Sequence, residues 1–170
     1  MLLNTKFKFI ATLFSLVALS CNHNSDYTTQ NVCDSSITLP SSYTLINENN
    51  ALNKDYCDFK VDTKDKYIDF YLSALILGRF NISSLSDAYN NAIIQCNLAI
   101  PSTKKSSNRF VITGRDKITG NIIHWKRIIG DRYVSDLRIE YDSEKHLELA
   151  SEVSFIIDSF SDITLQNQSK

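Results

Sequence analysis

The chain has 170 residues, with 18 Lys and Arg against 19 Asp and Glu, and 43% of it is apolar. This length favours a single domain, and a charged fraction of 22% with 11% aromatic residues excludes a wholly disordered chain. A formal net charge of −1 excludes a protein whose overall field attracts nucleic acid, so we expect no nucleic-acid partner.

The N-terminus carries an export signal. Lys6 and Lys8 precede an uncharged apolar run at residues 9–19. The run is about half of the roughly 20 residues that a membrane-spanning helix needs, and it has the length of a signal-peptide core. It ends in Ser20 and Cys21, a small residue directly before a cysteine. This junction resembles the lipobox of bacterial lipoproteins, which implies cleavage after Ser20 and a lipid on the Cys21 sulfur. An ordinary secretory signal cut nearby and a retained transmembrane anchor are the alternatives.

Residues 1–20 are thus expected to be the signal peptide and residues 21–36 a polar tether, because the second range has few apolar residues. Without residues 1–20 the chain has 16 basic and 19 acidic residues, a net charge of −3, so acyl chains rather than charge would hold it to a membrane. By analogy with lipoprotein sorting, Asn22 favours the outer over the inner membrane. The predicted location is the cell envelope, facing the periplasm.

Three further cysteines would lie in an oxidising compartment, where disulfides persist. Cys33 and Cys57 flank the first strands and are the natural pair, whose bridge would stabilise the fold by about 3 kcal/mol if unstrained. Cys96 falls on the apolar face of a predicted helix, where a free thiol behaves as a small hydrophobe. Pairing of Cys96 with another cysteine, or three reduced thiols, remains open.

One folded domain is expected over residues 37–162, with a polar tail at 163–170. Periodicity and turn residues predict strands at 37–39, 43–46, 56–61 and 67–77, a helix at 85–100, strands at 109–113, 118–129 and 132–141, and a helix from residue 142. Pro101 is expected to stop the first helix, and a polar loop follows it. Gly130 with Asp131 is a two-residue hairpin signal. The expected inner face of the second helix is Leu147, Ala150, Val153, Ser154, Ile157 and Phe160.

Helices placed between antiparallel hairpins indicate an α+β fold, an antiparallel sheet covered by two helices. The segment Leu39-Pro40-Ser41-Ser42-Tyr43, and the strand at 133–141 followed by a helix that ends at Phe160, resemble the opening and the close of PsbP-like and DcrB-like domains. The resemblance implies an α/β/α sandwich over most of the mature chain. It also implies a binding or assembly role, because these domains share no catalytic residues.

Few residues point to chemistry. His23, His124 and His146 are far apart in sequence, and none belongs to a metal-binding pair. Ser102 and Lys105 have the Ser-x-x-Lys spacing of some acylating enzymes, but no companion motif accompanies them. We therefore expect no catalytic residue, no cofactor and no metal. A small periplasmic hydrolase or metal-dependent enzyme is the alternative.

Charge is segregated along the chain, with a net of +6 over residues 104–132 and of −5 over residues 136–170. Such blocks steer a partner of opposite charge, or they attract each other within the fold. Because Arg and aromatic residues dominate binding hot spots, we predict that a protein partner docks on the basic hairpin, at Lys117, Trp125, Lys126, Arg127, Arg132 and Tyr133. Charge reversal at Arg127 and Arg132 should then slow association and leave stability unchanged.

The sequence thus predicts a non-catalytic binding or assembly protein of the cell envelope, with a membrane contact through its lipid and a protein partner. One specific form is an immunity protein that neutralises a toxin at the membrane, since tethering raises the local concentration of the protein there.

Overall fold

The computed structural model describes residues 26–32, 35–48, 56–64, 68–76, 85–130 and 133–163. The predicted signal peptide, Cys21, Cys33, Arg132 and most of the predicted tail lie outside these described residues. No helix in the described part of the chain is long and apolar enough to cross a membrane.

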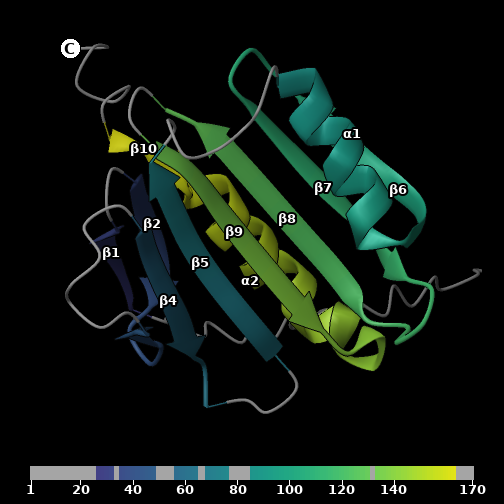
Figure 1. Ribbon diagram of the computed structural model, residues 1–170. Coiled ribbons are helices and arrows are strands. Elements are labelled where there is room, and N and C mark those ends of the chain that lie inside the picture. Colours follow the sequence, from purple (N-terminus) through teal and green to yellow (C-terminus); the bar gives the residue numbers. More distant parts are fainter. Residues whose placement is uncertain are drawn as a thin grey trace, which may run out of the picture.

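A seven-stranded sheet, whose neighbouring strands are all antiparallel, forms the centre of the fold (Figure 1). Its strand order is β3-β4-β5-β9-β8-β7-β6. The strands are β3 (Thr44–Asn47), β4 (Tyr56–Asp62), β5 (Ile68–Ile76), β6 (Leu98–Lys105), β7 (Arg109–Asp116), β8 (Ile122–Ile129) and β9 (Tyr133–Tyr141). Because β5 pairs with β9, the two halves of the chain meet in the middle of the sheet.

A smaller sheet has the order β1-β2-β10, with β1 at Tyr27–Val32, β2 at Ser35–Pro40 and β10 at Ser161–Asp162. The structure therefore differs from the predicted tether, because residues from 27 onward belong to the fold. β1 is an edge strand that pairs with β2. Most of its side chains are polar and exposed, so it is held mainly by backbone hydrogen bonds to β2. The buried apolar residues that anchor this sheet are Ile37 and Leu39 on β2 and Val32 at the end of β1.

One helix lies on each face of the large sheet (Figure 1). On one face, α1 (Leu85–Cys96) packs Ala88, Ala92 and Cys96 against apolar residues of β6, β7 and β8. On the other face, α2 (His146–Ser159) and the small sheet enclose the larger core. The antiparallel sheet with two helices confirms the predicted α+β fold.

Strand β6 was not predicted. The helix α1 ends at Cys96 instead of Ile100, and Asn97 takes a left-handed φ of 46°. The chain then continues as an edge strand that contains Pro101. An edge strand tolerates proline because its outward side needs no ladder hydrogen bond, and the register with β7 shifts between Ala99 and Ser102.

The second helix starts where the sequence predicts, but its inner face differs. The Asp142 side chain accepts a hydrogen bond of 2.9 Å from the Glu144 N–H and caps a short 3-10 turn (Ser143–Lys145) before α2. The residues buried from the helix and its end are Val153, Ile156, Ile157 and Phe160. This i, i+3, i+4, i+7 series places Leu149 against the core, whereas Leu147 is 97% exposed and Ser154 is also exposed.

Candidate functional site

A groove lies between α2 and the strands β6, β7 and β8, and we call it the α2 groove. One part, of about 240 Å³, is lined by Lys104, Lys105, Ser106, Arg109, Val111, Lys126 and Asp158. The adjoining part, of about 200 Å³, is lined by Ser102, Lys104, Val111, Thr113, His124, Ser154, Ile157 and Asp158. Lys104, Val111 and Asp158 line both parts, so the two hollows adjoin.

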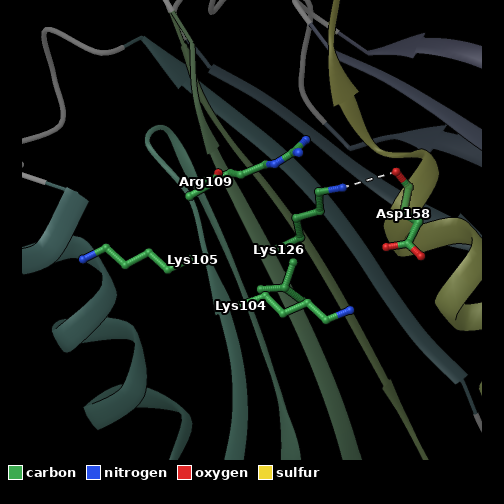
Figure 2. Close-up of a pocket in the computed structure, with 7 residues that line it drawn as sticks. Lys104, Lys105, Arg109, Lys126 and Asp158 are labelled. Atoms are coloured by element: carbon green, nitrogen blue, oxygen red, sulfur yellow. Dashed lines mark hydrogen bonds between the residues drawn. The ribbon is translucent and has the colours of Figure 1, made fainter.

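Strand pairing places the groove side chains. Lys104 lies opposite Val111, and Val111 lies opposite Lys126, so these three side chains form a row across β6, β7 and β8 on the face that α2 covers. Lys105, the next residue in β6, projects to the other face because side chains alternate along a strand. There its ammonium donates a hydrogen bond of 2.7 Å to Ser86 Oγ of α1. Figure 2 shows this divergence.

Lys126 is the buried member of the row, with 4% of its surface exposed. Its Nζ donates a hydrogen bond of 2.6 Å to the carbonyl oxygen of Ile157. It also donates one of 3.4 Å to the carbonyl oxygen of Asp158, which Figure 2 shows. These carbonyls belong to the last turn of α2, which carries the negative end of the helix dipole. Burial, and to a smaller extent the charge of Arg109, lower the pKa of Lys126 to about 8, and Asp158 partly opposes both. The residue thus joins β8 to α2 and still charges the groove.

The other two cations of the groove are exposed. Lys104 and Arg109 extend toward the α2 side (Figure 2). Within the described residues, no carboxylate forms an ion pair with either side chain. Three cations and the carboxylate of Asp158 leave this end of the groove with a formal net charge of +2, which favours an anion.

Beyond the shared Lys104 and Asp158, the other end of the groove presents neutral polar groups. Thr113 Oγ1 lies 3.1 Å from His124 Nδ1, and the Tyr141 hydroxyl lies 3.3 Å from His124 Nε2 and 2.9 Å from His146 Nδ1. Burial, and to a smaller extent His146, lowers the pKa of His124 to about 4. The imidazole is therefore neutral near pH 7 and acts as a hydrogen-bonding group.

The sequence pattern Ser-x-x-Lys does not form a pair in the structure. Ser102 lines the α2 groove, whereas the ammonium of Lys105 reaches α1 on the opposite face. Among the residues that the structure describes, no group of three or more His, Cys, Asp or Glu side chains is placed to hold a metal ion.

The predicted docking residues do not share one surface. Arg127 and Trp125 lie on the α1 face, where the Arg127 guanidinium makes two 2.7 Å contacts with the Asp136 carboxylate, and Trp125 Nε1 donates to the same carboxylate at 2.8 Å. Lys126 lies on the opposite face, under α2. The segment 124–128 alternates between two covered faces, so consecutive basic residues separate. The expectation that Arg127 can be reversed without loss of stability does not fit this buried pair.

The remaining members of that set are scattered. Lys117 is exposed in the turn between β7 and β8, Tyr133 is half-buried at the start of β9, and Arg132 lies outside the described residues. Lys104, Arg109 and Asp158 were not among the predicted site residues. Lys104 and Arg109 belong to the basic segment 104–132, whose net positive charge indicated a cationic surface. That the two share one face depends on strand β6, which was not predicted.

The predicted disulfide stays a prediction, because Cys33 lies outside the described residues. Cys96 is a free and buried thiol on α1, as its apolar spacing indicated.

No family model matches the chain, and no curated protein matches it. A solved structure that is similar is the solution structure of cyanobacterial PsbP (CyanoP) from Synechocystis sp. PCC 6803. The match has a TM-score of 0.56 at 8% identity and covers 86% of this chain and 98% of that one. At this identity the likeness concerns the fold alone. The protein has a PsbP-like α+β fold, as the resemblance in its sequence implied.

Proposed function

We propose that the protein is a lipid-anchored, non-catalytic binding protein of the bacterial cell envelope that holds an anionic group of its ligand in the α2 groove. The observation that carries the binding role is the convergence of Lys104, Arg109 and Lys126 on one groove that contains a single carboxylate, Asp158. A groove with an excess of positive charge and no ion pair at its two exposed cations attracts an anion.

The side chains of the groove favour binding over catalysis. A general base works best when its pKa is near the operating pH, and the pKa of His124, at about 4, is far below 7. In the described part of the chain, Ser102 and Ser154 make no hydrogen bond to a histidine or lysine that would activate their hydroxyls.

Two features support the lipid anchor: the signal-peptide pattern before Cys21, and the short length of chain between Cys21 and strand β1. Cys21 lies six positions before Tyr27, where β1 begins. At about 3.5 Å per extended residue they reach roughly 20 Å. A domain tethered in this way stays next to the membrane surface.

Labelling with a fatty acid tests the anchor. The wild-type chain should incorporate palmitate and stay with membranes, and Cys21→Ala should be unlabelled and either unprocessed or released. Labelling that survives this substitution would contradict the proposal.

Thermal unfolding in sulfate, compared with chloride at equal ionic strength, tests the groove. A ligand that binds only the folded chain raises its Tm. Sulfate should raise the Tm of the wild type and of the control Lys117→Gln, which changes an exposed cation outside the groove, but not that of the double variant Lys104→Gln/Arg109→Gln. An equal rise in all three proteins would move the anion site elsewhere.

A narrower form of the proposal is an immunity protein, in which the anionic group belongs to a toxin that arrives at the membrane. Tethering would then raise the concentration of the inhibitor where the toxin enters. Co-production with a toxin encoded by a neighbouring gene should protect cells, and Lys104→Glu/Arg109→Glu at equal abundance should not. If both proteins protect the cells equally, the groove does not bind the toxin.

A further inference from the structure

The α2 groove has two ends of different chemistry that meet at shared residues. One end presents the cations of Lys104, Arg109 and Lys126. The other end presents neutral polar groups, the hydroxyls of Ser102, Thr113 and Ser154 and the imidazole of His124. Lys104, Val111 and Asp158 line both, so a single small molecule can reach both ends. Their combined volume lies within the range of ordinary ligand pockets, roughly 300–1,000 Å³.

The cationic end matches a phosphate group better than a single carboxylate. Its formal net charge of +2 is neutralised by a phosphate monoester, which carries about −1.5 to −2 at pH 7. A carboxylate would leave one positive charge unmatched. Arg109 adds a planar guanidinium that can donate two parallel hydrogen bonds to phosphate oxygens.

The neutral end matches hydroxyl groups. Serine and threonine hydroxyls both donate and accept hydrogen bonds, and a carboxylate can accept two O–H groups at once. Ser102 and Ser154 are exposed on opposite walls, one on β6 and one on α2, and Asp158 stands between the two ends. Val111 supplies a small apolar floor for the carbon skeleton.

We propose that the ligand of the α2 groove is a phosphorylated polyol, a molecule that carries a phosphate next to several hydroxyl groups. This inference rests on the proposed function and adds the chemical class of the ligand. Soluble sugar phosphates carry this chemistry as monoesters, which match the charge of the cationic end. The headgroup of phosphatidylglycerol carries a phosphate next to hydroxyls as a diester with one negative charge, and a tethered domain would meet it at the membrane.

Calorimetric titration of the full chain, purified in a polyoxyethylene detergent that contains no sugar, tests the inference. Glucose 6-phosphate should bind about tenfold more tightly than inorganic phosphate at equal ionic strength, the gain expected from one or two added hydrogen bonds. Glucose should show no binding at the same concentrations. Equal binding of glucose 6-phosphate and phosphate overturns the inference but leaves the anion site, whereas binding of neither overturns both.

Two pairs of substitutions at exposed positions separate the ends of the groove. Ser102→Ala/Ser154→Ala should reduce the affinity for glucose 6-phosphate to that for phosphate and leave phosphate binding unchanged. Lys104→Gln/Arg109→Gln should abolish both, and the control Lys117→Gln should change neither. A serine pair variant that keeps the preference for glucose 6-phosphate would contradict the assignment of the neutral end.

A lipid arm identifies the source of the phosphate. The full chain is placed in nanodiscs that contain either phosphatidylglycerol or phosphatidylserine, which have the same charge but differ in the headgroup diol. Weaker binding of glucose 6-phosphate in phosphatidylglycerol than in phosphatidylserine assigns the groove to a lipid headgroup. Equal binding in both assigns it to a soluble phosphorylated polyol, and both results support the shared chemistry.

Discussion

The Lys126 ammonium donates a 2.6 Å hydrogen bond to the Ile157 carbonyl and so fastens strand β8 to the last turn of α2. The next residue, Arg127, makes an equally close contact with Asp136 on the opposite face of the sheet. Two adjacent cations of one strand therefore stabilise two different layers, and each gives a distinct prediction.

Lys126 should make the free energy of unfolding increase with pH in the alkaline range. Its pKa is lowered by burial from 10.5 to about 8, so between these values the unfolded chain binds more protons than the folded chain. The free energy of unfolding should therefore rise with pH in this window, by up to about 1.4 kcal/mol per pH unit from this group. Urea unfolding at pH 7.5, 8.5 and 9.5 should show the rise in the wild type and a smaller one in Lys126→Met. Parallel pH profiles for the two proteins would contradict it.

Substitution of the partly buried Asp136 should strongly lower the free energy of unfolding. Its replacement by Ala removes the carboxylate that Arg127 and Trp125 Nε1 both contact, which we expect to cost about 2–3 kcal/mol. The double variant Arg127→Met/Asp136→Leu should recover most of this loss. As a matched control, Arg138→Ala breaks an exposed pair with Glu140 and should cost at most about 1 kcal/mol. Equal losses for the two single variants in urea unfolding would refute the argument.

Cys96 should be inert in the native chain. The thiol is buried, and desolvation is the main cause of its raised pKa, so a thiol reagent finds little thiolate there. Denaturation without reductant should expose one reactive thiol, Cys96. Denaturation with reductant should expose Cys33 and Cys57 as well, if these two are bridged. Peptide mapping checks the assignment, and alkylation of Cys57 before reduction, or a peptide that links it to Cys96, would contradict the predicted bridge.

Gly130 should tolerate no side chain. A Cβ at this position would collide with the carboxylate of Asp162 on β10, which is only 5% exposed. We expect Gly130→Ala to lower the free energy of unfolding by about 1–3 kcal/mol, because the carboxylate or the hairpin must shift. Ser107→Ala, at an exposed loop position nearby, is the control and should be neutral. A Gly130→Ala protein as stable as this control would show that Asp162 can move freely.

The strands and the helix after residue 109 were mostly predictable because their alternation and turn residues are local signals. The strand predicted from residue 118 begins only at Ile122, because Ile118 lies exposed in the turn before it. Strand β6 was not, because Pro101 usually ends an element and only the edge position of β6 makes it acceptable. The groove was harder still. Its residues come from three strands and a helix, and their common face depends on strand pairing, which the charge pattern of residues 104–132 does not contain. Because side chains alternate along a strand, Lys126 and Arg127 point to opposite faces of the sheet, although the sequence analysis placed them on one docking surface.

The pairing of β5 with β9 also bears on the order of events during synthesis. It joins Ile68 to Tyr141 and Ile76 to Tyr133, which are 73 and 57 positions apart, and such non-local pairing slows folding to the range of roughly milliseconds to seconds. The two middle strands of the sheet cannot close until residue 141, near the end of the chain, has been made. Until then, β4 and β5 lack the strand that joins them to β8, so the sheet and the core beneath it can form only after most of the chain has been made.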